Sequence, residues 1–128
     1  MPYKIASFSP IPPGIVQFKV TDAAGLKDNE VEVINVYNLP EAEIIEKVQD
    51  CDIFLGDFTF TTKITRDIVF AAKNLKLIQQ PNVGYQQIDV EACTEAGVSV
   101  ANSAGANTIS VSELAITLAL ALIKNIMY

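Results

Sequence analysis

Two short apolar runs, separated by a helical segment that ends in glycine, constrain the fold of this chain most strongly. Leu75 to Ile78 forms the first run, and Pro81-Asn82-Val83-Gly84 ends it with residues that stop a strand or permit unusual backbone angles. Apolar residues then recur at helical spacing from Ile88 to Ala96, Gly97 ends that segment, and Val98 to Val100 is extended again. This order predicts a β-α-β unit with two parallel strands.

The same alternation runs through the rest of the chain. Short segments rich in Ile, Val, Leu and Phe predict five strands, at Lys4–Phe8, Val31–Val36, Ile53–Leu55, Leu75–Ile78 and Val98–Val100. Helical spacing fills the gaps, at Val16–Ala24, Glu41–Val48, Ile64–Ala72 and Val90–Ala96. Strands that alternate with helices indicate an α/β fold, and we expect a flavodoxin-like, doubly wound, parallel five-stranded sheet.

Two separated motifs carry a family resemblance. The loop Asn82-Val83-Gly84-Tyr85-Gln86-Gln87-Ile88-Asp89 resembles the G-V-G-Y-D-N-I-D loop of the D-isomer-specific 2-hydroxyacid dehydrogenases, the phosphoglycerate and glyoxylate-reductase-like enzymes. Asn102-Ser103-Ala104-Gly105-Ala106-Asn107 and Ser110-Val111-Ser112-Glu113 are similar to that family's N-T-P-G-x-N and S-V-A-E segments. The resemblance implies an NAD(P)-dependent oxidoreductase that transfers a hydride between nicotinamide and a D-2-hydroxy acid or 2-oxo acid.

Several positions depart from the family's pattern. The first loop glycine is Asn82 here, the loop aspartate is Gln86, and the proline of the second motif is Ala104. Asn tolerates left-handed backbone angles better than most residues, so we expect the turn at Asn82 to form. Asp57-Phe58 stands where many phosphoglycerate-type members carry an Arg after the third strand. We expect a carboxylate there to repel a substrate phosphate.

The predicted fold indicates where a ligand would bind. In open parallel sheets, ligands lie outside the carboxyl ends of the strands, where four loops meet, at Ser9–Gly14, Asp57–Thr62, Gln80–Tyr85 and Ala101–Asn107. We expect the backbone amides of Val83 and Gly84 to hold a substrate carboxylate, because a glycine leaves the main chain uncovered. A plain strand-to-helix turn is the alternative interpretation.

Asn107 precedes a helix whose start is marked by Ser110-x-x-Glu113, a pattern typical of a capping box. The simplest role of Asn107 is therefore capping or a local turn. The family resemblance implies in addition that Asn107 reaches the substrate and that Val111 packs against the nicotinamide ring. A nucleophilic role for Ser110 is disfavoured, because no base stands near it in sequence and capping serines are common.

The last helix is apolar on every face, since Thr117 is the only polar residue from Leu114 to Ile123. The segment is too short to span a bilayer, which needs about 20 such residues. We expect it to lie between two domains or in a subunit interface, and a homodimer is the simplest assembly. The predicted organisation is a substrate domain over residues 1–106, followed by a hinge and first helix over 107–128 that lead to a dinucleotide-binding domain.

The sequence lacks two features of a complete dehydrogenase. No G-x-G-x-x-G occurs, so the phosphate-binding turn of a dinucleotide site is absent from this chain, which also contains no histidine. In the family a His assisted by an acid transfers the proton, and an Arg polarises the substrate carbonyl. We therefore expect the amino-terminal piece of a subunit, inactive alone, with no catalytic residue and no tightly bound NAD or NADP.

Composition narrows the partners and the compartment. With 15 acids against 9 bases and a net charge of −6, nucleic acid and anionic membrane surfaces are disfavoured. Cys51 and Cys93 match no zinc or redox spacing, so we expect buried thiols in a reducing compartment and no metal site. No secretory signal is visible, and the cytoplasm is the expected location.

Two other functions fit the same alternation of strands and helices. Receiver domains carry a phosphate-accepting Asp at the end of the third strand, where Asp57 falls, but they also need an acidic pair after the first strand and a Lys after the fifth. This chain has Phe8-Ser9-Pro10 and Ala101-Asn102-Ser103 at those places, so magnesium and phosphate would not be held. A dehydrogenase-like binding module without catalysis keeps the fold and the ligand site.

Overall fold

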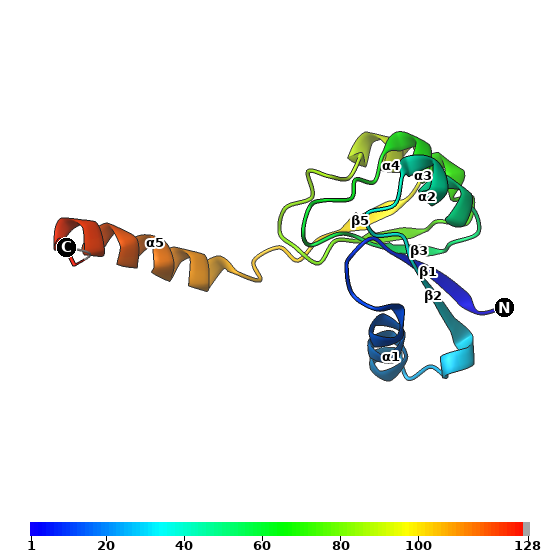
Figure 1. Ribbon diagram of the computed structural model, residues 1–128, viewed down its shortest axis with the longest axis horizontal. Coiled ribbons are helices and arrows are strands. Elements are labelled where there is room, and N and C mark those ends of the chain that lie inside the picture. Colours follow the sequence, from blue (N-terminus) through cyan, green and yellow to red (C-terminus); the bar gives the residue numbers. More distant parts are fainter. Residues whose placement is uncertain (127–128) are drawn as a thin grey trace.

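One parallel sheet organises the chain. In the computed structural model, which describes residues 1–126, the strands are β1 (Tyr3–Ser7), β2 (Val31–Asn35), β3 (Ile53–Leu55), β4 (Leu77–Gln79) and β5 (Ser99–Ala101). They lie in the order β2-β1-β3-β4-β5, and every neighbouring pair is parallel (Figure 1). This is the strand order of a flavodoxin-like, doubly wound sheet, so the predicted fold class is confirmed.

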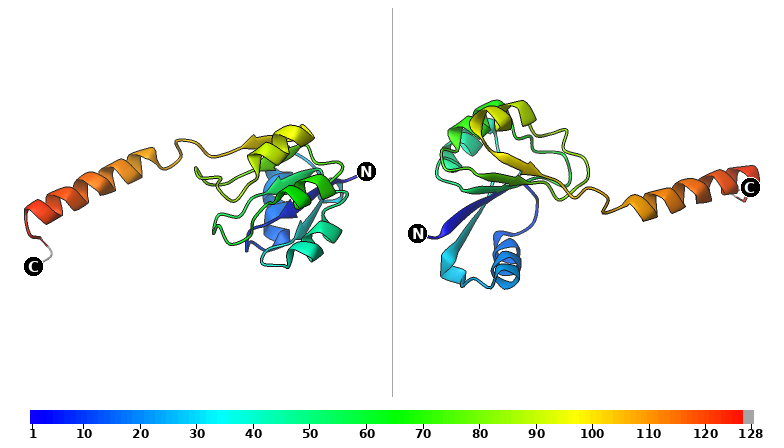
Figure 2. Two further views of the ribbon diagram at one scale, coloured as in Figure 1. Left: turned by 90° about the horizontal axis from the view of Figure 1, so that it is seen from above. Right: turned by 180° about the vertical axis from the view of Figure 1, so that it is seen from behind.

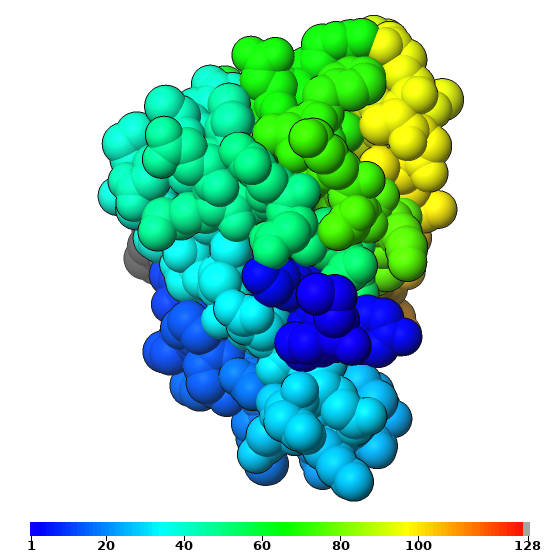
Figure 3. All heavy atoms as spheres, turned by 90° about the vertical axis from the view of Figure 1, so that its right-hand side faces the viewer, coloured from blue at the N-terminus to red at the C-terminus, as the bar shows by residue number. Residues whose placement is uncertain are grey.

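Helices cover both faces of the sheet unequally. They are α1 (Pro13–Ala24), the 3-10 helix η1 (Asp28–Glu30), α2 (Glu41–Lys47), α3 (Arg66–Ala71) and α4 (Val90–Ala96). Helices α2, α3 and α4 lie on one face, and α1 lies on the other (Figures 1 and 2). From the end opposite the last helix, the dark blue amino terminus is seen between these two layers (Figure 3).

The core lies between the sheet and the three-helix layer. Phe8 and Phe54 are fully buried there, with ring centroids 5.1 Å apart, and Ile78 is buried beside them. On the opposite face, Ile53 and Leu77 pair in register and remain half-buried. That face is less covered because α1 is the only helix on it in the described part of the chain.

Helix ends agree with the glycine signals in the sequence. Gly25 and Gly97 end α1 and α4 at φ 66° and 71°, the left-handed region in which glycine avoids a Cβ clash. Helix α1 begins at Pro13, earlier than predicted, because a proline fixes the φ angle that a first helical residue needs.

Seven of the nine predicted strands and helices differ from the structure by one to three residues at an end, and three of them show what sets the bounds. Strand β4 begins at Leu77 because the Leu75 N–H donates to the carbonyl of Ala72, 3.2 Å away, in a turn that follows α3. Helix α3 begins at Arg66 because Ile64 pairs with Ile88 in an isolated parallel bridge. Strand β5 runs from Ser99 to Ala101, one residue later than predicted, and its register with β4 sets that position.

The last helix, α5 (Thr108–Ile123), extends away from the sheet (Figures 1 and 2). None of its residues is buried. The predicted capping box is wrong, because the helix begins two residues before Ser110 and includes both Ser110 and Glu113. Asn107 occupies the N-cap position, and its side chain makes no capping hydrogen bond. Over residues 1–126, no helix has the length and apolar character needed to cross a membrane.

Candidate functional site

Side-chain amides tie together the loops that follow β3, β4 and β5. Asn82 Nδ2 donates to the carbonyl of Phe58, 2.9 Å away, and so joins the first two loops. Asn102 Nδ2 donates to the carbonyl of Val83 at 2.7 Å, and the Ser103 N–H donates to the carbonyl of Asn82 at 3.0 Å. These bonds join the third loop to the second, so the three loops form one unit at the carboxyl edge of the sheet.

This unit surrounds an open cavity of about 410 Å³. The three predicted substrate-binding residues, Val83, Gly84 and Asn107, all line it. Its remaining lining residues are Phe60, Pro81, Asn82 and Ala106. The structure therefore brings the three predicted residues together, while their role in binding stays a prediction.

Val83 and Gly84 line this cavity, and their main-chain N–H groups are available as hydrogen-bond donors. Within residues 1–126, neither the Val83 N–H nor the Gly84 N–H donates to a protein group. Backbone donors left without a protein partner are satisfied by water or by a ligand. Two successive amides of this kind suit a carboxylate, which accepts several hydrogen bonds at once.

The turn predicted at Asn82 forms, but without a left-handed backbone angle. Neither Asn82 nor Gly84 has a left-handed φ, a conformation that the non-glycine residues Asn38, Phe60 and Asn125 adopt instead. Asn82 matters through its side-chain bond to Phe58. Gly84 matters for space, because a Cβ there would lie 2.6 Å from Gln86 Oε1.

The Asp57 carboxylate forms hydrogen bonds within its own loop, and Asp57 does not line the cavity. The residue is fully buried, and its carboxylate accepts hydrogen bonds from the N–H groups of Thr59 at 2.8 Å and of Thr61 and Thr62 at 2.9 Å. The Thr59 hydroxyl donates to it as well, at 2.7 Å. Burial raises the pKa of the Asp57 carboxyl, but these donors outweigh burial and hold the pKa below its ordinary value.

Two expectations change with this geometry. The Asp57 carboxylate is buried, bonded within its own loop and absent from the cavity lining, so it would not meet a substrate phosphate directly as predicted. The receiver alternative also fails at this residue, since a phosphate acceptor must be reachable. In the part of the chain that the structure describes, no cluster of three His, Cys, Asp or Glu residues could hold a metal ion.

A buried polar layer supports the loop from below. Gln80 Nε2 and Gln87 Nε2 both donate to the carbonyl of Asp57, at 3.3 and 3.2 Å. The Oε1 atoms of both glutamines are buried and accept no hydrogen bond from the described residues. Gly56 makes room for this layer, because a Cβ there would lie 1.9 Å from Gln80 Oε1. A side chain at position 56 would therefore displace the Gln80 amide from this layer.

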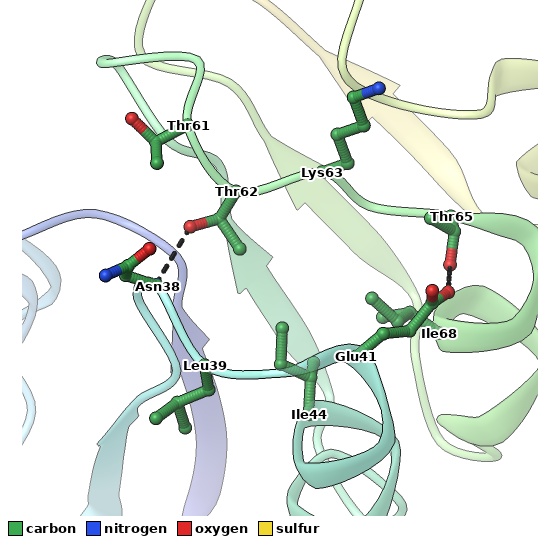
Figure 4. A pocket seen from close by; sticks show the side chains of 9 residues that line it. All are labelled: Asn38, Leu39, Glu41, Ile44, Thr61, Thr62, Lys63, Thr65 and Ile68. Carbon is green, nitrogen blue, oxygen red and sulfur yellow. Dashed lines mark hydrogen bonds between the residues drawn. The ribbon is translucent and has the colours of Figure 1, made fainter.

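A second hollow, of about 180 Å³, lies between α2 and the loop after β3 (Figure 4). Two of its polar contacts are internal, since Thr62 Oγ1 accepts from the Asn38 N–H at 3.0 Å and the Thr65 hydroxyl donates to Glu41 (Figure 4). This hollow shares no lining residue with the first cavity. It adds no group to the predicted chemistry.

Val111, the predicted nicotinamide contact, does not line the substrate cavity. It lies in α5 one turn after Asn107, to whose carbonyl its N–H donates at 2.9 Å, and its side chain is exposed.

The cysteines agree with the sequence analysis, since both are free and buried. Burial raises the pKa of the Cys51 thiol to about 11, which leaves it protonated and unreactive at neutral pH.

Sequence reasoning missed three contributors to this site. Asn82 and Asn102 act through side-chain bonds between loops, and their positions just after strand ends were the available signal. Phe60 lines the cavity with a φ of 60°, and nothing in the sequence pattern indicates that a phenylalanine adopts this conformation.

A family comparison agrees with the fold and the motifs. The model of the D-isomer specific 2-hydroxyacid dehydrogenase catalytic domain matches residues 10–123. The chain belongs to this family. The resemblance seen in the two sequence motifs is thereby confirmed, and the cavity described above lies within the matched residues.

Individual relatives are much longer than this chain. D-3-phosphoglycerate dehydrogenase of Methanocaldococcus jannaschii is 40% identical over 105 residues, which are 82% of this chain and 20% of the relative. Hydroxypyruvate reductase of Thermotoga maritima is 36% identical over 101 residues, 79% of this chain and 32% of the relative. The crystal structure of NAD+-bound 3-phosphoglycerate dehydrogenase of Entamoeba histolytica superposes with a TM-score of 0.66 at 28% identity, covering 94% of this chain and 39% of the other.

Proposed function

We propose that this chain is the substrate-binding domain of an NAD(P)-dependent D-2-hydroxyacid dehydrogenase, which transfers a hydride between nicotinamide and a 2-oxo or 2-hydroxy acid. The observation that carries the proposal is that Val83 and Gly84 line the cavity and that their N–H groups donate to no group within residues 1–126. The substrate carboxylate would accept from both. The Asn107 side chain, which caps no helix N–H, is free to contact the bound acid.

The residues of this chain fit the acid better than the cofactor. The sequence contains no glycine fingerprint for a dinucleotide pyrophosphate, and Val111 is the only residue proposed to contact nicotinamide. When bound, the nicotinamide supplies or accepts the hydride. The part played by this chain is to bind and orient the acid, and a further domain of the full-length protein would bind the cofactor.

Proton transfer is likewise assigned elsewhere in the full-length protein. The chain has no histidine, and the carboxylate nearest the cavity in sequence, Asp57, is buried and fully engaged by its own loop. We therefore assign binding residues, and no acid or base, to this domain.

Helix α5 supports a proposal about assembly. Leu114, Leu118 and Leu122 are all more than half exposed, although burying a leucine stabilises a protein by about 1.5–3 kcal/mol. We propose that α5 packs between this domain and the cofactor domain, in a homodimer of the full-length protein.

The test of the proposed function uses both the full-length protein and the 128-residue chain. The full-length protein should oxidise NADH or NADPH with a 2-oxo acid, whereas the 128-residue chain should neither turn over 2-oxo acids nor bind NADH with micromolar affinity. Oxamate, a carboxylate analogue of the substrate, should shift the amide resonances of Val83 and Gly84. Specific oxamate binding without turnover by the full-length protein would instead support the non-catalytic binding module.

A further inference from the structure

The geometry points to the class of acid that this site accepts. We propose that the substrate is a 2-oxo acid whose side chain is apolar and uncharged, and that Phe60 contacts this side chain. The inference rests on the proposed function and deepens it, since it sets this protein apart from the phosphorylated acid in the names of its phosphoglycerate relatives.

The cavity supplies donors for one carboxylate and no charge for a second acidic group. None of its seven lining residues is charged. Proteins bind phosphate with Arg or Lys, whose charge-assisted hydrogen bonds offset the loss of water from the phosphate. The polar groups of the lining are the main-chain amides of Val83 and Gly84 and the side chains of two asparagines. The other lining residues, Phe60, Pro81 and Ala106, are apolar.

Phe60 is held in an unusual conformation at the edge of this cavity. Its φ of 60° is rare for a bulky residue and strains the backbone. Nevertheless Phe60 stays 45% exposed, so burial of this residue in the domain does not explain the conformation. Strain of this kind persists where the surrounding structure over-determines it, as at ligand-binding loops.

The surrounding structure that fixes Phe60 is the Asp57 carboxylate. It accepts from the N–H groups of both neighbours of Phe60, Thr59 at 2.8 Å and Thr61 at 2.9 Å. The Asn82 side chain then ties the same loop to the Val83-Gly84 turn through the carbonyl of Phe58. The backbone of Phe60 is therefore held in place relative to the Val83-Gly84 turn before a ligand arrives.

Substrate selectivity of the full-length protein tests the inference. The panel contains glyoxylate, which has no side chain, 4-methyl-2-oxopentanoate and phenylpyruvate, which have apolar side chains, and 3-phosphohydroxypyruvate. We expect kcat/KM for the better apolar substrate to exceed that for 3-phosphohydroxypyruvate by about tenfold or more, the selectivity that a pocket of this kind supplies.

Variants of the loop test the role of Phe60. Phe60→Ala should lower kcat/KM for the apolar substrates by about tenfold and change kcat/KM for glyoxylate by less than about threefold. Phe60→Gly removes the same ring and relaxes the backbone at φ 60°, so it keeps the loop folded and should show the same loss. Phe58→Ala is the matched control, because Phe58 is similarly exposed, at 43%, and does not line the cavity. In this variant the ratio of kcat/KM for the apolar substrates to kcat/KM for glyoxylate should stay unchanged.

The failures of the two proposals can be told apart. Turnover of 2-oxo acids with a preference for 3-phosphohydroxypyruvate would overturn the inference and leave the proposed function intact. Equal losses for glyoxylate and the apolar substrates in both Phe60 variants would show that the ring supports the loop only, and would overturn its assignment. No turnover of any acid by the folded, cofactor-binding protein would overturn both proposals.

Discussion

Asp57 shows how one buried charge organises a surface loop. Its carboxylate gathers donors from three threonines, and its carbonyl accepts from Gln80 and Gln87. An amide side chain at this position could accept at one atom only and would bring an extra N–H group into a space without an acceptor for it. The loop therefore depends on the charged form of the residue.

Replacing Asp57 with Asn should destabilise the protein by about 1.5–3 kcal/mol at pH 7, the value of hydrogen bonds to a charged group. Because the folded-state pKa of Asp57 lies below its ordinary value of 3.8, its contribution to stability is present above about pH 4 and is lost as the pH falls through the folded pKa. Urea unfolding of the protein and the variant should therefore give a difference that shrinks from pH 7 to pH 3. Asp22→Asn, at an exposed acid, is the control and should have little effect at either pH.

Gly84 allows a test of the carboxylate-binding turn. Gly84→Val in the full-length protein should lower kcat/KM for the best 2-oxo acid by about tenfold or more, a loss of about 1.4 kcal/mol in transition-state stabilisation, because a branched side chain crowds both Gln86 and the amides. The affinity for the cofactor should not change. Gly84→Ala should have a smaller effect, since Gln86 is exposed and can move aside. An unchanged kcat/KM in the Val variant would rule out the assignment of this turn.

At the scale of elements, one glycine at a helix end and one inside a helix distinguish the effect of backbone strain from the effect of steric crowding. Gly97→Ala should destabilise the protein by about 1 kcal/mol, because alanine at φ 71° is strained although its Cβ would meet no atom. Gly14→Ala is the matched variant in α1, where φ is not left-handed and the space is also open, so it should stabilise by about 0.5–1 kcal/mol. Thermal unfolding would measure both, and a loss of stability at Gly14 as large as that at Gly97 would contradict the strain argument.

Element order and type were predictable from this sequence because each strand is a short apolar run bounded by a helix-stopping or turn residue. Gly25 and Gly97 were read correctly, since a left-handed helix end is a local property of the chain. The start of β4 was not predictable, because it depends on its register against β3. The start of α5 was not either, because a serine with a glutamate three residues later is equally compatible with the helix interior.

Within the candidate site, too, features set by local sequence were predictable and contacts between distant segments were not. The strand order places the loops at one edge, so the meeting of Val83, Gly84 and Asn107 around one cavity follows from local signals and topology. The orientation of Asp57 and the bonds of Asn82 and Asn102 join different loops, and a linear sequence does not specify such contacts. Val111 lies outside the cavity because α5 leaves the domain.

For the whole molecule, the exposed apolar helix α5 predicts self-association of the 128-residue chain. Leu118→Glu combined with Leu122→Glu should weaken association and leave the five-stranded domain folded, because no residue of α5 is buried in that domain. Sedimentation should show dimers or larger species for the unmodified chain and a shift to monomer for the variant, with unchanged circular dichroism. Ser112→Glu with Thr117→Glu adds the same charge at polar, exposed positions and should perturb association less. A monodisperse monomer for the unmodified chain would contradict self-association through α5, and unfolding of the Leu variant would show that the domain depends on these leucines.

The strand order also has a consequence for synthesis on the ribosome. β2 and β3 both pair with β1, β4 joins β3, and β5 joins β4, so each new strand adds to an outer edge and none has to enter between two strands already paired. The sheet can therefore grow in the order in which its strands leave the exit tunnel, with the longest pairing, β1 with β2, available first. A nascent chain arrested after β3 has emerged already contains three neighbouring strands of the five, in the order β2-β1-β3.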